Sequence, residues 1–428
     1  MHTFVVARAV HGIEPLVATE IRRSRLGVVR GMRHREVWFE ASPGADLMGL
    51  RTADDLLVAA AVVDGIGHDR SALRRLARAA RAVDVHQATA LPRARAVEVS
   101  ASFVGRRNYT RFEIEDAVGA ELARPLRLPY HSRKDGVRPP RDAMSWRVTI
   151  EGDQALIALR PAARPLHRRA YKTASIRGTL HPPVAAAMAA LARLGDAGTV
   201  LDPCCGAGTT LIEAHALAPG ARLLGFDHDP AALHAAATNA RSAVGGATHP
   251  RAAGSAPGGA ACFHGDCAAH PSDNGRGRAR FAHPHSAAVS AWADEGGGSP
   301  RAWADAEGGS AYAWAGAEDR AAFAWTGAEG QAVFEWAVAD GGRIPVVGGG
   351  ADRVLVNPPW GRQVPPRGLL ARDLGPLWRE VRRVLADDGV AVALVHDEIP
   401  PGFAVEEAVR VSLSGQHPVI AVLRKARR

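Results

Sequence analysis

Cysteine is scarce in this chain of 428 residues, which contains four, and long apolar runs are absent. So few cysteines argue against a disulfide framework and favour a reducing compartment, so we expect a cytoplasmic protein. Neither the adjacent Cys204-Cys205 nor the pair Cys262 and Cys267 has the spacing of zinc ligands, so we expect no metal site. No stretch approaches the length of a membrane span, and residues 1–15 carry no long apolar run. We therefore expect neither a membrane anchor nor a signal peptide.

Lysine is also rare, and arginine supplies almost all of the positive charge. The only lysines are Lys134, Lys172 and Lys425, and the net charge is +9. Residues 1–180 contain 31 basic and 19 acidic residues, whereas residues 181–428 contain 22 and 25. A compositional bias explains arginine in place of lysine, but it does not explain this uneven distribution. The basic half therefore suggests a part that binds a polyanion, and nucleic acid is favoured over a merely solvated basic surface.

The segment Asn357-Pro358-Pro359-Trp360 closes an apolar run, 353–356, that is typical of a buried strand. The Asn357 side-chain oxygen and the Pro358 carbonyl can both accept hydrogen bonds from one planar NH2 group. Two such acceptors would fix the nitrogen and turn its lone pair toward an electrophile. Trp360 can stack on a base that has left its helix. The alternative is a proline-rich turn with no chemical role.

A glycine loop lies upstream, where residues 199–214 predict a strand, a tight loop and a helix. Gly206 and Gly208 allow the backbone to pass close to a ligand. The loop lacks the third glycine of the dinucleotide-binding fingerprint and the lysine of a phosphate-binding P-loop. A ligand without phosphates therefore fits this loop better.

Acidic residues end the neighbouring predicted strands. Asp202 ends the first, Asp227 ends a second at 222–227, and Asp266 ends a third at 261–266. Together with Asn357 they would place four polar side chains on the edge of a sheet where open α/β sheets bind ligands, with Asp227 set to hold ribose hydroxyls. For any single aspartate, a helix N-cap or loop acid is the alternative.

These motifs resemble the class I S-adenosyl-L-methionine-dependent methyltransferases, in the branch that modifies exocyclic amines through an Asn/Asp-Pro-Pro-aromatic motif. The resemblance implies a Rossmann-like α/β fold with a seven-stranded sheet and S-adenosylmethionine as cofactor. It implies that Asp202 through Gly208 form the first cofactor motif, with Thr209 and Asn357 beside them. Asp227 matches the ribose-binding acid, and Asp266 matches the acid near the adenine. Cys204-Cys205 depart from the usual pair before Gly206, but both are small enough for a tight loop.

The N-terminal half predicts a small α+β unit at 1–68, with strands at 3–7 and 36–40 and helices at 11–21 and 54–63. Its layout resembles the ferredoxin-like domain that precedes an RNA-binding THUMP domain. Residues 69–164 resemble the THUMP domain itself, with a helix at 114–122 and a hairpin of 145–150 and 155–159. The candidate RNA contacts, whose alternative is a water-exposed loop, are Arg106, Arg107, Tyr109, Arg111, Arg168 and Arg169.

An insertion interrupts the predicted methyltransferase domain, which spans 165–428. Tryptophan recurs every 11 residues in it, at Trp292, Trp303, Trp314, Trp325 and Trp336. Glycine, alanine and serine fill most of the rest, so we expect residues of about 242–259 and 268–350 to be mostly disordered or loosely helical. An aromatic surface for a partner or for single-stranded RNA is the sharper hypothesis.

The resemblance implies an RNA guanine-N2 methyltransferase that acts on tRNA, with Asn357, Pro358 and Trp360 as catalytic residues. Because the motif does not separate guanine from adenine, an rRNA guanine and an adenine-N6 target remain alternatives. A non-catalytic RNA-binding protein with a decayed cofactor site is a third, which the intact glycine loop opposes. Sequence leaves the oligomeric state open.

Overall fold

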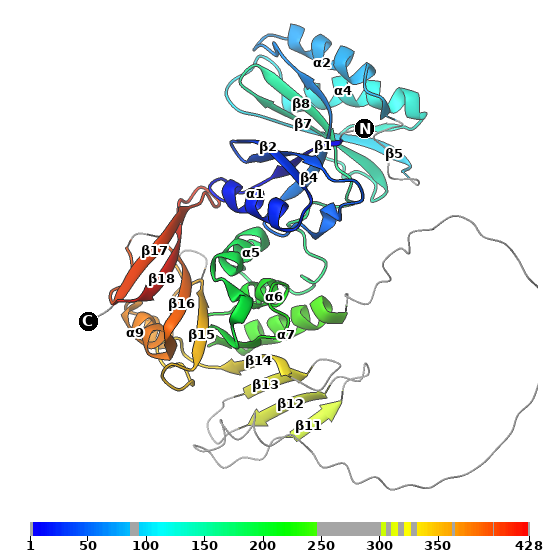
Figure 1. Cartoon of the computed structure of the whole chain (residues 1–428). Helices are drawn as coiled ribbons and strands as arrows, with labels where there is room; N and C mark the ends of the chain where they lie inside the picture. Colours follow the sequence, from blue (N-terminus) through cyan, green and yellow to red (C-terminus); the bar gives the residue numbers. More distant parts are fainter. Residues whose placement is uncertain are drawn as a thin grey trace, which may run out of the picture.

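The computed structural model describes residues 3–85, 94–245, 301–304, 310–315, 321–326, 332–361, 364–396 and 398–426. These residues form an eight-stranded sheet and a ten-stranded sheet, each with its own helices (Figure 1). Within these residues, no helix combines the length and the apolar character needed to cross a bilayer.

The eight-stranded sheet contains both units that were predicted for the N-terminal half. Its strand order is β2-β3-β1-β4-β8-β7-β5-β6. The strands are β1 (Thr3–Arg8), β2 (Gly27–Arg33), β3 (Glu36–Ala41), β4 (Asp55–Val63), β5 (Ala96–Phe103), β6 (Tyr130–His131), β7 (Ala143–Glu151) and β8 (Gln154–Leu159). The helices are α1 (Glu14–Arg23), α2 (Ser71–Arg81) and α4 (Arg111–Leu126), with a 3-10 turn at Leu47–Gly49.

Strand β4 is one of two places where the predicted secondary structure was wrong. Residues 54–63 were expected to be helical, but Asp55–Val63 pairs with β1 on one side and with β8 on the other. Its alanines favour a helix locally, whereas a central place between two strands satisfies its backbone and buries Leu56 and Leu57. The predicted helix at 114–122 and the hairpin at 145–159 are confirmed in α4 and in β7–β8.

The ten-stranded sheet has the order β11-β12-β13-β14-β10-β9-β15-β16-β18-β17. Strands β14, β10, β9, β15 and β16 run parallel, and β18 and β17 are antiparallel additions. The strands are β9 (Thr199–Asp202), β10 (Arg222–Asp227), β11 (Arg301–Ala304), β12 (Ser310–Ala315), β13 (Ala321–Thr326), β14 (Ala332–Val338), β15 (Ala351–Val356), β16 (Leu385–Val395), β17 (Phe403–Arg410) and β18 (Val419–Lys425). The helices are α5 (Pro182–Leu191), α6 (Thr209–His215), α7 (Pro230–Gly245) and α9 (Gly375–Val384), with 3-10 turns at Leu194–Asp196 and Gly368–Leu370.

Helices cover both faces of the parallel strands. Residues of α5, α6 and α7 share one buried cluster with Leu223, Leu355 and Val392 of the sheet. Residues of α9 share a second cluster with Leu201 and Val354, whose side chains point to the other face. The result is a doubly wound parallel sheet, as the sequence predicted, with its strand ends gathered at one edge.

The insertion supplies a strand of this sheet. The expectation of disorder or loose helix is wrong for Ala332–Val338, which forms β14 and pairs in parallel with β10. Trp336, the last tryptophan of the repeat, is buried against Gly225, where an added Cβ would lie 2.3 Å from the indole ring. The predicted third strand at 261–266 lies outside the described residues, and the strand beside β10 is β14.

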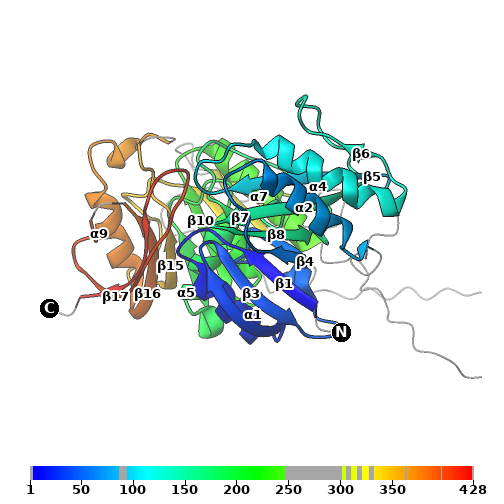
Figure 2. The same ribbon diagram turned by 90° about the horizontal axis from the view of Figure 1, so that it is seen from above.

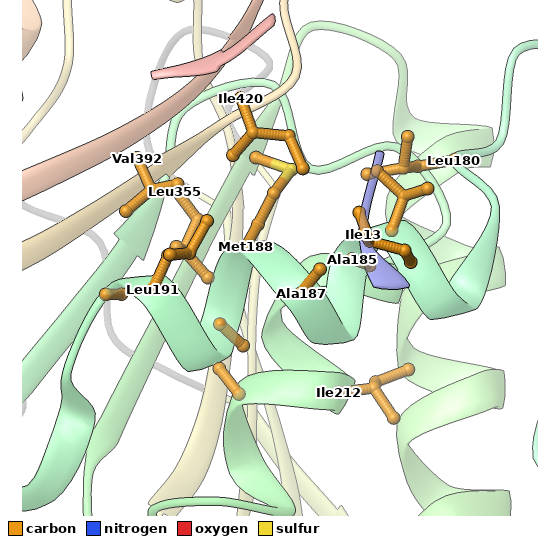
Figure 3. Close-up of a cluster of buried hydrophobic side chains, with 14 of the residues drawn as sticks. Ile13, Leu180, Ala185, Ala187, Met188, Leu191, Ile212, Leu355, Val392 and Ile420 are labelled. Carbon is orange, nitrogen blue, oxygen red and sulfur yellow. The ribbon is translucent and has the colours of Figure 1, made fainter. Parts of the chain in front are cut away.

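The two sheets share a core where the N-terminal unit meets α5. Ile13 lies in one buried cluster with Ala185 and Met188 of α5 and with Ile420 of β18 (Figure 3). The Ser412 N–H donates to the His11 carbonyl at 2.9 Å across this junction. Figure 2 shows β1, β3 and α1 beside α5 in the view from above. The N-terminal unit is therefore packed directly against α5 and β18 of the second sheet, and the chain is not its only connection to them.

Candidate active site

A cavity of about 1250 Å³ opens at the edge where β9, β10, β14 and β15 end. Its lining includes these predicted site residues: Asp202, Gly206, Thr209, Asp227, Asn357, Pro358, Trp360, Arg168 and Arg169. Gly208 lies behind this lining at the start of α6. Side chains at the ends of β9, β10 and β15 therefore meet in one cavity, and these are three of the four strand ends predicted from sequence.

The glycine loop connects β9 to α6 through two left-handed residues. Gly206 has φ +53 and Gly208 has φ +77. A Cβ on Gly208 would lie 2.9 Å from the Trp336 ring and 3.0 Å from the Ala236 side chain, so the loop passes too close to its neighbours for any other residue. The Gly206 N–H donates to the Asp227 carboxylate at 2.9 Å, which ties the loop to the end of β10.

Asp202 is almost completely buried at the base of the loop. Its carboxylate accepts hydrogen bonds from the Cys204 N–H at 2.9 Å and from the Thr210 hydroxyl. Burial raises the pKa of Asp202 to about 7, and the nearby Asp227 carboxylate adds to the rise. The group therefore titrates near neutral pH, where a cationic ligand would favour its charged form.

The unusual pair Cys204-Cys205 fits the tight loop. The Cys205 N–H donates to the Phe226 carbonyl at 2.8 Å, so the loop is pinned to β10 at this point as well. Burial raises the pKa of both thiols, with the neighbouring aspartates as a second cause, so they remain protonated and unreactive. Among the described residues, no group of three histidine, cysteine or acidic side chains could hold a metal ion.

The Asn357 to Trp360 corner follows β15 directly. Asn357 is half-buried and faces the cavity, and among the described residues its amide has no hydrogen-bond partner. Pro358 is buried. Trp360 is half-buried rather than fully exposed, and its ring packs edge-on against His396 with centroids 3.8 Å apart. The Trp360 Nε1 atom is buried without a hydrogen-bond partner within the described part of the chain.

Asp340 is an acidic residue of the cavity that sequence reasoning missed. It follows β14, lines the cavity, and accepts hydrogen bonds from the Gly342 and Leu369 N–H groups at 2.8 Å each. Asp266, the predicted acid at this place, lies outside the described residues. The signal that could have found Asp340 is its position, an acid two residues after an apolar segment and 11 residues before β15.

The six predicted RNA contacts divide into two groups. Arg106, Arg111 and Arg168 are exposed. Arg107 donates to the carbonyls of Ile66, Gly67 and Gly152, and Tyr109 is buried with its hydroxyl on the Gly67 carbonyl. Arg107 and Tyr109 therefore tie their turn to residues 66–67, and Arg107 also ties it to the turn between β7 and β8, so their geometry does not support a contact with RNA.

Arg169 has a structural partner too. Its Nε donates to Glu213 at 2.9 Å, and Glu213 also accepts from Arg51 Nε at 2.7 Å and from the Tyr171 hydroxyl at 2.9 Å. Glu213 is fully buried in α6, directly after the glycine loop, while Arg51 belongs to the N-terminal unit. Arg169 is thus committed to the junction between the two parts of the chain.

A second buried side chain, Asn239, bonds the segment between β8 and α5 to the glycine loop. Asn239 of α7 accepts from the N–H groups of Thr173 and Ala174 and donates to the carbonyls of Ala174 and Ala207. Four hydrogen bonds satisfy this buried amide completely. Sequence reasoning missed four basic residues that line the cavity. Arg164, Lys172 and Arg177 come from the segment between β8 and α5, and Arg367 comes from the loop after β15.

Comparison with known proteins agrees with this geometry. Residues 169–251 match the family described as RMKL-like, methyltransferase domain. The chain is 32% identical to the tRNA (guanine(6)-N2)-methyltransferase of Thermus thermophilus over 171 residues, which are 40% of this chain and 47% of that protein. It is 33% identical to the ribosomal RNA large subunit methyltransferase K/L of Methylococcus capsulatus over 25% of this chain and 14% of that protein. The chain thus spans less than half of the curated relatives it matches.

Solved structures extend the likeness to the whole fold. TrmN from Thermus thermophilus superposes with a TM-score of 0.65 at 24% identity and covers 99% of this chain and 100% of its own. SMU.472, whose structure contains bound SAH, superposes with a TM-score of 0.59 at 14% identity, and the match covers 100% of this chain and 99% of SMU.472. Residues 169–251 are therefore similar to the RMKL-like methyltransferase domain, and the whole chain shares the fold of TrmN.

Proposed function

We propose that this protein transfers a methyl group from S-adenosylmethionine to the exocyclic N2 amine of a guanosine in RNA, with tRNA as the favoured substrate. The observation that carries the proposal is the Asn357 amide, which faces the cavity without a partner among the described residues, beside the glycine loop. The curated relative that methylates a tRNA guanine at N2 supports the choice of base and of tRNA.

The cavity fits the cofactor in charge and shape. Asp227 and Asp340, together with Asp202 in its ionised form, give the cavity a negative charge, which suits a ligand with a sulfonium and an amino group. The left-handed Gly206 leaves the backbone open to close approach, since an added Cβ there would have only Ile176 nearby, at 3.5 Å. Asp227 is the residue that would hold the ribose hydroxyls, and Asp340 takes the place proposed for the acid near the adenine.

The residues of the chain act by positioning. When bound, S-adenosylmethionine supplies an electrophilic methyl group. Asn357 Oδ1 and the Pro358 carbonyl accept hydrogen bonds from the guanine amine and turn its lone pair toward that methyl. Trp360 offers a face on which the base can stack. The amine loses its proton to water after transfer, so no strong general base is needed.

The basic residues around the cavity support an RNA substrate. Arg164, Arg168, Arg177 and Arg367 are exposed where they line the cavity, and Lys172 is half-buried. Positive groups around a negative floor suit a nucleotide whose phosphates remain outside while its base enters. We also propose, with the boundaries expected from sequence, that residues 1–68 and 69–164 serve RNA binding and residues 165–428 serve catalysis.

Nucleoside mass spectrometry of separated tRNA and rRNA, from cells with and without the gene, tests the proposal. Loss of N2-methylguanosine from a tRNA fraction is the expected result. Loss from rRNA would favour the second candidate, which the ribosomal RNA relatives support. Loss of a methyladenosine would keep the mechanism but change the base, and no change in either pool would refute an RNA methyltransferase.

A variant separates catalysis from cofactor binding. Asn357→Ala removes one of the two acceptors for the amine, so turnover should fall by about 100-fold or more while S-adenosylmethionine affinity changes little. Glu407→Ala is the control, because Glu407 is exposed on β17 and lines neither of the two cavities found among the described residues. Unchanged turnover in Asn357→Ala would refute the positioning mechanism.

A further inference from the structure

A second cavity, of about 400 Å³, lies at the junction of the two sheets. Its walls come from β1, β4, β5 and β7 of the eight-stranded sheet and from residues 412–414 after β17. It shares four lining residues with the larger cavity: His167, His181, Leu413 and Ser414. The two cavities are therefore neighbours, and the roles proposed so far make no use of the second one.

Arg147 of β7 points into this second cavity. Trp146, Val148 and Ile150 of the same strand are buried with α2 and α4, so the alternating Arg147 lies on the opposite, helix-free face. Its cross-strand partner Ala158 belongs to the small buried cluster on that same face. A guanidinium is thus held at the wall of a cavity by a rigid strand.

Arg147 differs from the other charged groups around it. Arg160 forms a fork with the Asp55 carboxylate at 2.6–2.9 Å, and Arg8 is paired with Glu36. Within the described residues, Arg147 has no carboxylate or carbonyl partner, although it is half-buried. Burial lowers the pKa of Arg147 to about 10, and the positive charge of Arg160 adds to the effect. The cation remains protonated at neutral pH and has lost hydration, while the two acidic groups that oppose this shift, Asp55 and Glu98, are bonded to Arg160 and Ser145 rather than to Arg147.

The acidic groups that line this cavity already have partners. Asp54 accepts from His181 Nε2 at 2.7 Å and lies 4.0 Å from Arg35. The Asp55 charge is taken up by the Arg160 fork. Ser102 and Thr149 add hydroxyl donors on the same wall as Arg147. The cavity therefore presents unpaired positive charge and donors, which matches an oxygen anion.

We propose that this second cavity binds a backbone phosphodiester of the RNA strand that delivers the target nucleotide, with Arg147 as its anchor. The inference rests on the proposed function, because the shared wall at His167 and His181 places the phosphate site beside the cavity that would hold the base. A phosphate would give Arg147 a two-pronged, charge-assisted partner. Binding there would fix the strand without reading its sequence.

Arg147→Met, which keeps length and removes charge, tests the site against Arg78→Met on α2. Arg78 is exposed on a helix that covers the other face of the sheet. For Arg147→Met we expect the KM for substrate RNA to rise about tenfold with kcat nearly unchanged, and the slope of log affinity against log salt to fall by about one. Inorganic phosphate should raise the thermal midpoint of the wild type more than that of Arg147→Met. Arg78→Met should match the wild type in each measurement.

Arg147→Lys keeps the charge without the fork, so it should retain the salt slope while recovering only part of the affinity. If Arg147→Met and Arg78→Met bind RNA equally well and respond equally to phosphate, the site is refuted even though methylation proceeds. If no RNA is methylated but the phosphate effect still depends on Arg147, the proposed function fails while the anion site stands. If Arg147→Met folds poorly, Arg147→Lys tests the site instead. A wild-type slope of log RNA affinity against log salt together with weaker RNA binding would support the site, and wild-type RNA affinity would refute it.

Discussion

Replacing Glu213 with glutamine tests whether the buried ionic cluster at the junction holds residues 165–428 to the N-terminal unit. The substitution keeps shape and an acceptor oxygen but removes the charge. Glu213 is 0% exposed, and the side chains of Arg51 and Arg169 that it bonds are 30% and 10% exposed. Two guanidinium groups would therefore keep their charge in a poorly hydrated place with no carboxylate to balance it.

The expected loss follows from that burial. Breaking a buried ion pair by removing one partner costs roughly 3–5 kcal/mol. For a domain of about 250 residues, each kcal/mol lowers the melting temperature by about 2–4 °C. The midpoint of thermal unfolding should thus fall by roughly 6–20 °C. Because α6 begins at the glycine loop, S-adenosylmethionine affinity should fall with it.

Glu406→Gln is the matched control for this change. Glu406 also has two arginine partners, Arg424 at 2.6 Å and Arg193 at 3.2 Å, but its side chain is 32% exposed. An exposed pair contributes at most about 1 kcal/mol, so differential scanning calorimetry should show a small shift. Equal shifts in the two variants would refute the reasoning that burial, rather than the number of partners, sets the energy.

Three further predictions concern the cavity. Gly208→Ala should weaken S-adenosylmethionine binding at least tenfold in calorimetry, because the added Cβ would lie 2.9 Å from the Trp336 ring. Gly206→Ala should cost only about 1 kcal/mol of backbone strain, because its Cβ would lie 3.5 Å from the nearest atom. Equal losses of affinity in the two variants would contradict this reasoning. Burial raises the pKa of Asp202 to about 7, and the ionised form favours a cationic ligand. The affinity for S-adenosylmethionine should therefore rise with pH, by at most about tenfold per pH unit, and level off above about pH 7. Asp202→Asn should remove this pH dependence. Asp340→Ala should weaken S-adenosylmethionine binding about tenfold, and Asp266→Ala should leave it unchanged. The opposite result would show that Asp266, the acid predicted from sequence, contacts the cofactor instead of Asp340.

The candidate site was largely predictable because its signals are local. A strand, two glycines and an acid at fixed spacing predict the loop from Asp202 to Gly208, and an apolar run before Asn357 predicts a strand end. The structure places these segments on adjacent strands β9 and β15, which pair in parallel. Parallel strands end at the same edge, so correct strand assignments were enough to bring the polar side chains together.

Assignments that depend on partners distant in sequence were less successful. Sequence does not show whether an arginine faces water or pairs with a carboxylate. It therefore could not distinguish the exposed Arg168 from the neighbouring Arg169, which is bound to Glu213. Likewise, alanine-rich Asp55–Val63 favours a helix until β1 and β8 flank it. These outcomes depend on contacts across more than 40 residues.

The sequence by itself determined the class of fold, the sheet edge at which the cavity lies and the corner from Asn357 to Trp360, because strand ends and tight loops are encoded by neighbouring residues. Only the tertiary structure decided which strand lies beside β10. It selected β14, whose Trp336 fills the space left by Gly225 and Gly208, and it thereby placed Asp340 in the cavity. Tertiary structure also left Arg147 unpaired beside a second cavity, since pairing of buried charges is settled by packing between segments and not by their order in the chain.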